Sequence, residues 1–473
     1  MHISSLFALL WVCLVALTEA RVPGIGMESA VSRKRMPYQD TKKVEVQAAS
    51  GVLLPEGTSD VSSSIFNLAK VILGAGVLSL PSGIAAFSDS TDALLPATVL
   101  LAAMGTVSAY SFSSIGKACK IHGVGSFTSA WASSVGEGSA PFIATMITVK
   151  TFFACLAFSI ILGDSFSSIA RSVGLPEFMH NRSNMILLLT TCVITPLNML
   201  KNMDLLKYTS MLGLGGILYC AAFIVKRYLD GSYTQGGKFF QDIAVNHRPA
   251  FNTIMPGDKS FFAVFTLVAM IATAFVAHYS ASRFWVDLKQ RTIPKYNKVV
   301  AVAFSFSALM YGIIMYAGFL TFGGNSLGFI LNNYSSNDVL ATIARAAIGF
   351  GILFGYPLTF VALRDGALDL LKLNSSASTP LTIALMAMLT VGALHLTNLG
   401  KVVAFSGSLI GSNLIYTVPA IMNLKNIYRE ARSKKDGKAV LNSAQAIDRN
   451  INVGLMAMGV GISIIGVYVT LSK

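Results

Sequence analysis

"NLAKVILGAGVLSLP", residues Asn67 to Pro81, begins like a membrane-spanning helix and then interrupts itself. It carries a lysine, Lys70, followed by two glycines, Gly74 and Gly76, around one alanine. In hydrocarbon every backbone N–H and C=O group must be paired, so an interrupted helix is tolerated only where it is buried in protein or lines a cavity. The stretch therefore predicts either a broken spanning helix whose backbone a ligand can approach, or a close-packing motif of small residues between helices.

The composition indicates a membrane protein. Of the 473 residues 53% are hydrophobic and only 12% are charged, and the mean hydropathy is +0.63. Soluble domains carry about 25% charged residues, so one water-soluble globule is excluded. The net charge of +14 lies mainly in short loops between apolar runs, which favours a role in membrane orientation over nucleic-acid binding. The five cysteines show no metal-binding or disulfide spacing, and no metal or cofactor is predicted.

The fold class predicted is an all-α polytopic membrane protein. A spanning helix needs about 20 predominantly apolar residues. Eleven segments fit this description, and together they make a transmembrane domain over 62–473: they cover 62–87, 93–116, 140–163, 184–200, 206–226, 260–281, 299–322, 339–363, 380–396, 401–424 and 451–471.

Lysine and arginine in the loops predict the orientation. The loops 283–298 and 425–450 are strongly basic, and eleven spans put both on the same side as the N-terminus of the domain, which should be cytoplasmic. The opposite side contains the glycosylation sequons at Asn181 and Asn333. We expect a multi-pass integral membrane protein in the plasma membrane, the vacuole or another organelle.

The N-terminus is read separately from the domain. Residues 1–20 form a signal-like or anchor segment, and residues 21–61 a polar, basic arm expected to be disordered. A cleaved signal peptide would place the arm in the lumen, against the loop charges. Three alternatives stay open: an uncleaved extra helix, a true start at Met27 or Met36, or a two-part organelle presequence.

A second candidate break lies in "MIATAFVAHYSASRFWVD", residues 270–287, which begins apolar and then turns polar. It belongs to the sixth predicted helix. In transporters built from two inverted five-helix repeats, helices one and six are equivalent and both are broken near the midplane. The two interrupted segments therefore fit one architecture.

Six motifs follow one another along residues 62–473: "NLAKVILGAGVLSLPSG", "FSIILGDSF", "TPLNMLKNMDLLKYTS", "AFVAHYSASRFWVDLK", "YAGFLTFGGN" with "ILNNY", and "GSNLIYTVPAIMNL". In this order they resemble the amino acid/auxin permease family, which includes vacuolar amino acid transporters and sodium-coupled neutral amino acid transporters. The resemblance implies eleven helices with the N-terminus inside, a LeuT-type 5+5 inverted repeat, and transport of small amino acids driven by protons or sodium.

The resemblance also implies a substrate site. The substrate carboxylate would meet the backbone of the helix-one break, and the rest of the site would come from the helix-six break and from helix three. The residues so implied are Gly74, Ala75, Gly76, Val77, Thr273, Ala274, Phe275 and Phe158. Relatives often have tyrosine at the position of Phe158, so any hydrogen bond from that hydroxyl is missing in this chain.

Three cationic side chains are candidates for coupling to an ion: Lys70, His278 and Lys150. Lys70 stands where sodium-coupled relatives share an asparagine, and the helix-eight stretch 346–356 contains no serine or threonine. Sodium is a hard cation that needs oxygen ligands, so we expect proton coupling instead. Structural roles for these three side chains stay open.

Other charged residues play no part in this prediction. No aspartate or glutamate falls inside a predicted span, and Arg345 and Arg364 are expected to be interfacial anchors at the ends of helix eight. A carboxylate relay for protons is therefore disfavoured.

The predicted function is a secondary active symporter for small, neutral amino acids, with the lipid bilayer as its surroundings and no nucleic-acid partner. The alternatives are a non-transporting amino acid sensor on the same fold and a sodium-coupled symporter. An ion channel and an enzyme are disfavoured, because neither a filter-like loop nor a constellation of nucleophile, acid and base stands out. The oligomeric state is not predicted.

Overall fold

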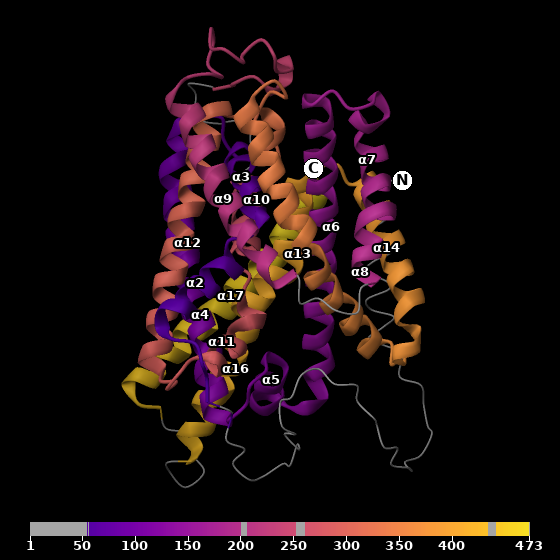
Figure 1. Cartoon of the computed structure of the whole chain (residues 1–473). Helices are drawn as coiled ribbons and strands as arrows, with labels where there is room; N and C mark the ends of the chain where they lie inside the picture. The colour runs from indigo at the N-terminus through magenta and orange to yellow at the C-terminus, as the bar shows by residue number, and fades with distance from the viewer. Residues whose placement is uncertain (1–53, 55, 200–205, 252–260, 434–440, 473) are drawn as a thin grey trace. The chain divides into compact units, whose positions relative to one another are not determined.

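The computed structural model describes residue 54 and residues 56–199, 206–251, 261–433 and 441–472. The signal-like segment 1–20 and the arm up to residue 53 lie outside the described residues. From Glu56 onward the chain forms one compact unit, a bundle of helices shown in Figure 1. Among the described residues there is no β-strand, only two isolated bridges.

The α-helices are, in chain order, α2 (Val61–Ile72), α3 (Leu80–Ala85), α4 (Leu94–His122), α5 (Phe127–Val135), α6 (Ala140–Ser172), α7 (Arg182–Leu189), α8 (Thr195–Met199), α9 (Leu206–Leu229), α10 (Val264–Ala274), α11 (Ala281–Asp287), α12 (Ile293–Phe322), α13 (Val339–Leu370), α14 (Ser378–His395), α15 (Leu399–Ser406), α16 (Val418–Ser433) and α17 (Ser443–Ser472). Two π-helical turns, Gly407–Gly411 and Asn413–Thr417, connect α15 to α16.

The all-α membrane fold predicted from the sequence is confirmed. Eight helices in the described chain are long and apolar enough to cross a membrane, and a ninth span is formed if α2 and the bent segment after it are counted together. The two further segments of the predicted set, 184–200 and 206–226, are helical as α7–α8 and α9. The count of eleven spans stays a prediction.

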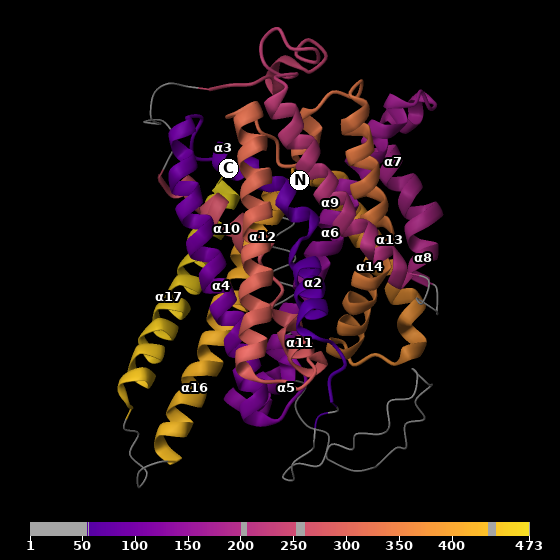
Figure 2. The same ribbon diagram turned by 60° about the vertical axis from the view of Figure 1, so that its left-hand side comes forward.

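Both predicted breaks are present. α2 ends at Ile72, and α3 follows after a 3₁₀ turn, Ala75–Ser79. α10 ends at Ala274, and α11 begins after a 3₁₀ turn, His278–Ser280. In Figures 1 and 2 α2 lies below α3, whereas α10 lies above α11, so the two broken helices run in opposite directions. This is the relation that an inverted repeat requires.

The remaining helices flank these two on opposite sides, as Figure 2 shows. α7 and α14 pack along α6, while α16 packs on α4, α5 and α17. The α11–α12 connection and the end of α16 lie at the same end of the bundle, as the charges of the two basic loops predicted. Which side of the membrane this end faces stays a prediction.

The residues just before α2 are tied to this basic end. The N–H of Ser59 donates to the carbonyl of Asp287 at 2.9 Å, and the N–H of Lys289 donates to the carbonyl of Ser59 at 2.8 Å. Gly57 is required here, because a Cβ atom would lie 2.5 Å from the Asp287 carbonyl. The last residues of the predicted arm are therefore part of the folded unit. Asp60 then caps α2, and hydrogen bonds from Ser63 lower the pKa of its carboxyl group.

Three features at the opposite end of the bundle differ from what the sequence suggested. Arg345 is not an interfacial anchor: it is 1% exposed and donates to the carbonyls of Leu331 and Tyr334 at 2.8 and 2.6 Å. A buried guanidinium has five N–H groups to satisfy, and the loop before α13 supplies their acceptors. Asn333 is fully buried, with its side-chain oxygen and nitrogen both hydrogen-bonded, so its sequon is closed to glycosylation.

The third correction concerns Asp164. α6 continues to Ser172, past the predicted end at residue 163, so a carboxylate does lie inside this helix. Its two oxygens accept hydrogen bonds from Arg182 Nε at 2.5 Å and from Asn332 Nδ2 at 2.9 Å. Asp164 is thus paired with a cation inside the protein, and a buried charge needs such a partner.

Candidate functional site

The backbone of the helix-one break borders open space. Gly74 is exposed although it lies between α2 and α3, two helices of the bundle. A Cβ atom on Gly76 would meet nothing within 4 Å, and one on Gly74 only the carbonyl oxygen of Ile72, at 3.9 Å. The two glycines are therefore not used to bring helices together, and the close-packing alternative does not describe them.

The break also offers a hydrogen-bond donor. The first bond that closes the 3₁₀ turn runs from the N–H of Val77 to the carbonyl of Gly74, at 3.2 Å. The N–H group of Gly76 precedes this bond and has no backbone acceptor among the described residues. Val77 is fully buried and fixes the turn against the core. A free N–H group beside an open space suits a carboxylate.

The helix-six break is closed by packing. The ring of Phe275 is buried, stacks on Phe304 with centroids 5.8 Å apart, and lies edge-on to Tyr311 at 5.0 Å. The Thr273 hydroxyl donates to the carbonyl of Val403 on α15, at 2.8 Å. The side chains of Thr273 and Phe275 thus hold the break in place.

One tyrosine joins the two breaks. The hydroxyl oxygen of Tyr311, on α12, lies 2.6 Å from the carbonyl oxygen of Ile72 and 2.7 Å from that of Ala274. These carbonyls end α2 and α10, where the helix leaves its last C=O groups without partners. A phenol has one proton, so it donates to one carbonyl at a time. Tyr311 therefore couples the ends of the two half-helices.

His278 is fully buried on the far side of the helix-six break. Its Nε2 lies 2.8 Å from the Ser111 hydroxyl and 3.0 Å from the carbonyl of Ser108, both on α4. The carbonyl can only accept, so this bond puts the ring proton on Nε2. Nδ1 has no partner among the described residues and is enclosed by the rings of Phe112 and Phe304. The histidine can orient helix six, but it lacks a second partner for passing a proton on.

The two lysines lie on different elements. Lys150, on α6, places its ammonium 3.3 Å from the Tyr279 hydroxyl and 4.4 Å from the centre of that ring. Lys70 lies in the last turn of α2, two residues before Ile72, and is half-buried. A cation in the last turn of a helix is favoured by the helix dipole. The structure does not bring Lys70, Lys150 and His278 into contact with one another.

Phe158 contacts a tyrosine from another helix. Its ring lies 6.1 Å from the ring of Tyr356 on α13, and the Tyr356 hydroxyl is 3.0 Å from that of Ser159. The phenol of Tyr356 therefore stands next to Phe158.

Sequence reasoning missed Tyr311 and Asp164. Asp164 stands inside the quoted motif "FSIILGDSF", so its place was visible although its partner Arg182 was not. Tyr311 is one tyrosine in a long apolar run, and nothing near it in the sequence marks it.

Comparisons with known proteins agree with this geometry. The chain is 24% identical over 428 residues to "Vacuolar amino acid transporter 5" of Schizosaccharomyces pombe, covering 88% of this chain and 96% of that protein. It is 24% identical over 379 residues to "Putative sodium-coupled neutral amino acid transporter 11" of Danio rerio, covering 78% and 80%.

Among solved structures, the inward-facing conformation of Mhp1 superposes with a TM-score of 0.53 at 12% identity, covering 90% of this chain and 95% of that one. This likeness shows the fold, which is of the LeuT type. The family model described as "Transmembrane amino acid transporter protein" matches residues 57–471, which is nearly the whole folded unit. The chain belongs to this transmembrane amino acid transporter family.

Proposed function

We propose that the chain is a secondary active transporter that moves small neutral amino acids by alternating access, coupled to protons and independent of sodium. The observation that carries this proposal is the open helix-one break, where the N–H group of Gly76 has no backbone acceptor and a Cβ atom on Gly76 would meet nothing within 4 Å among the described residues. A zwitterionic amino acid has the carboxylate that such a donor binds.

A neutral side chain is favoured by the charges around the breaks. Asp164 is already paired with Arg182 and Asn332, so it is not free to hold a cationic substrate side chain. The residues of the two breaks carry no carboxylate of their own. An amino acid with an uncharged side chain needs no such partner.

Sodium independence is supported by the hydrogen bonds that the carbonyl oxygens near the breaks already accept. A sodium ion needs several oxygen ligands. The carbonyls of Ile72 and Ala274 converge, but the Tyr311 hydroxyl lies between them. Lys70 adds a positive charge one turn from the break, and the α13 stretch 346–356 offers no hydroxyl group from serine or threonine.

Lys70 is the proposed proton carrier. Of the three candidates, His278 is hydrogen-bonded to α4 and enclosed by aromatic rings, and Lys150 is engaged with Tyr279. Lys70 has no hydrogen-bond or ion-pair partner in the described part of the chain, and it lies on the helix that carries the open break. A lysine that is partly desolvated there can exchange its proton more readily than one in water.

The test uses purified protein in sealed proteoliposomes and follows the uptake of a labelled mixture of neutral amino acids. An inward proton gradient and an inward sodium gradient are imposed separately, and Lys70→Asn is measured beside the unaltered protein. We expect accumulation under the proton gradient only, and loss of proton-driven accumulation in Lys70→Asn. Accumulation driven by sodium would contradict the proposal, and binding without accumulation would favour the sensor.

A further inference from the structure

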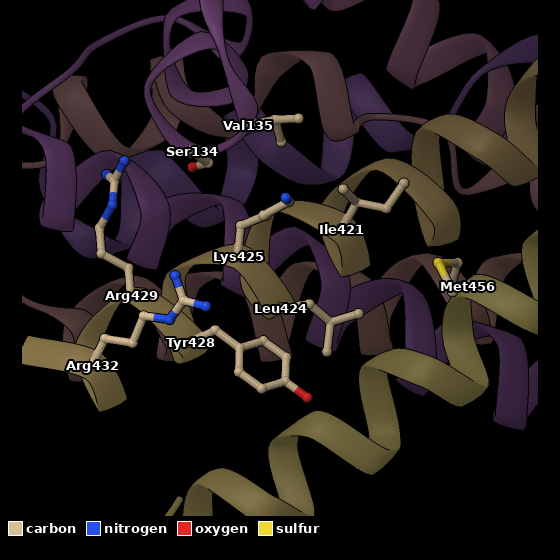
Figure 3. Close-up of a pocket in the computed structure, with 9 residues that line it drawn as sticks. All are labelled: Ser134, Val135, Ile421, Leu424, Lys425, Tyr428, Arg429, Arg432 and Met456. Atoms are coloured by element: carbon tan, nitrogen blue, oxygen red, sulfur yellow. The ribbon is translucent and has the colours of Figure 1, made fainter. Parts of the chain in front are cut away.

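A cavity of about 700 Å³ opens at the basic end of the bundle, between α5, α16 and α17 (Figure 3). It is separate from both helix breaks. Its lining consists of Ser134, Val135, Ile421, Leu424, Lys425, Tyr428, Arg429, Arg432 and Met456. A volume of this size is typical of a small-molecule site.

Three cations lie on one face of α16. Lys425, Arg429 and Arg432 are spaced i, i+4 and i+7, which puts them in one row about 11 Å long. Figure 3 shows all three side chains on the side of α16 that faces Ser134 and Val135 of α5. No carboxylate is among the residues that line the cavity.

Few protein groups compensate this charge. Arg429 donates one hydrogen bond to the carbonyl of Ser133, at 3.2 Å, which holds its guanidinium at the mouth of the cavity. Lys425 and Arg432 have neither an ion pair nor a hydrogen bond within the described ranges. Three adjacent positive charges repel one another unless an anion lies between them.

The side of the cavity toward α17 has an apolar wall. Ile421, Leu424 and Met456 form this wall. Along α17, Ile451 and Val453 are more than 40% exposed. Exposed apolar side chains on a spanning helix are covered by the acyl chains of lipids.

We propose that this cavity binds the phosphorylated headgroup of an anionic membrane lipid, with its phosphates between Lys425, Arg429 and Arg432 and its glycerol end against the apolar wall. Basic pockets between helices at the end of a membrane domain suit such headgroups. An inositol lipid with one added phosphate carries about three negative charges, which match the three cations.

Other occupants fit less well. The N-terminal residues 21–53 contain six lysines and arginines against three acidic residues, and residues 434–440 contain three lysines against one aspartate. Both segments would be repelled by a basic cavity. A water-soluble phosphate compound would make no use of the apolar wall. Basic residues near a helix C-terminus are also favoured by the helix dipole alone, and this simpler explanation predicts no preference for one lipid.

The test measures lipid binding to the purified full-length protein in detergent by native mass spectrometry. The probes are dioctanoyl phosphatidylinositol 4-phosphate, dioctanoyl phosphatidylcholine and inorganic phosphate. We expect the phosphorylated inositol lipid to bind at least about tenfold more tightly than the other two, because only this lipid has both the charges and the acyl chains.

Two double variants locate the site. Arg429→Gln/Arg432→Gln removes two cavity charges, and Arg283→Gln/Lys298→Gln removes two charges from the other basic loop. We expect the first to weaken binding of the inositol lipid about tenfold or more and the second less than about twofold. Lys425→Gln, which leaves the Arg429–Ser133 bond intact, should weaken binding on its own even if the double variant is unstable.

Three results would overturn the proposal. Equal losses in both double variants would mean that only the overall charge matters. Equal binding of phosphatidylcholine would remove the headgroup requirement. Equal binding of inorganic phosphate would assign the cavity to a soluble anion.

Discussion

The two broken helices have the same backbone arrangement, but one break borders open space and the other is closely packed. Each has a half-helix, a non-helical step and a 3₁₀ turn. At the helix-one break the backbone of Gly76 borders open space, and its N–H group lacks a backbone acceptor among the described residues. At the helix-six break Phe275 and His278 are buried completely. One break is therefore open beside its backbone, as the proposed substrate site requires, and the other is closed by packing.

Glycines near the two breaks show the same difference. Gly76 leaves room that no protein atom occupies. Gly407 lies on the π-helical turn that packs against α10. A Cβ atom on it would lie 2.0 Å from the carbonyl oxygen of Ala269, so the backbone of α10 already occupies that space. Small residues near a break therefore either leave open space beside the backbone or allow a neighbouring helix to approach closely. Only the packing in the folded structure distinguishes the two cases.

The largest effect is expected for Gly76→Val. The Cβ atom of the valine would meet nothing within 4 Å among the described residues, so we expect the thermal midpoint hardly to change. Uptake should fall about 100-fold or more, because the substrate could no longer approach the N–H group. Gly454→Val is the matched control: its Cβ also meets nothing within 4 Å, but it lies on α17. Equal uptake by the two variants in proteoliposomes would show that the open space is not the site.

A smaller effect is expected for Tyr311→Phe, which tests whether the two breaks act together. Removal of the hydroxyl leaves the carbonyls of Ile72 and Ala274 without their shared donor. We expect uptake to fall about tenfold, since one unsatisfied buried acceptor costs about 1–3 kcal/mol. Tyr296→Phe, on the same helix, removes a hydroxyl that donates to the Ala281 carbonyl and should change uptake less. Equal losses would mean that any buried phenol on α12 matters.

Gly407→Ala should act on stability. The added methyl group would push α15 away from α10, and overpacking of this kind costs about 1–3 kcal/mol. The folded fraction should still bind amino acids. Gly461→Ala adds the same methyl group where nothing lies within 4 Å and should leave the thermal midpoint unchanged. If Gly407→Ala melted like its control, the close approach of the two helices would be refuted.

The smallest effect is expected for His278→Gln. Glutamine can still donate a hydrogen bond toward the carbonyl of Ser108, so helix six should keep its orientation. We propose that His278 has a structural role only. Because glutamine keeps the neutral hydrogen bond, we expect proton-driven uptake to stay within about twofold of the unaltered protein at every pH. Measured uptake that loses its pH dependence in this variant would instead make His278 the proton carrier.

The sequence was sufficient to predict both breaks, because glycines around an alanine and a polar turn in an apolar run are local signals. It was not sufficient to predict which break is open. That depends on Phe275 reaching Phe304, and on Thr273 reaching Val403, which is 130 positions away. Such contacts leave no mark on the nearby sequence.

The charged residues show the same limit. A count of apolar residues ended helix three at residue 163, because an aspartate is costly in a membrane. In the structure Arg182 pairs with Asp164, and the helix continues for two more turns. Arg345 was assigned to the membrane interface for the same reason. In the structure it is buried, and its guanidinium donates hydrogen bonds to backbone carbonyls of the loop before α13.

The central claim is that the helix-one break binds the substrate by its carboxylate, and thermal stabilisation by ligands tests it most directly. A ligand that binds only the folded state stabilises it by RT ln(1 + [L]/Kd), so the melting temperature rises as the ligand concentration exceeds Kd. We would titrate the purified protein, Gly76→Val and Gly454→Val with neutral amino acids and with their methyl esters, which lack the carboxylate. We predict that the amino acids stabilise the unaltered protein and Gly454→Val but not Gly76→Val, and that the esters stabilise none of the three. Equal stabilisation by esters, or of Gly76→Val by amino acids, would contradict the account.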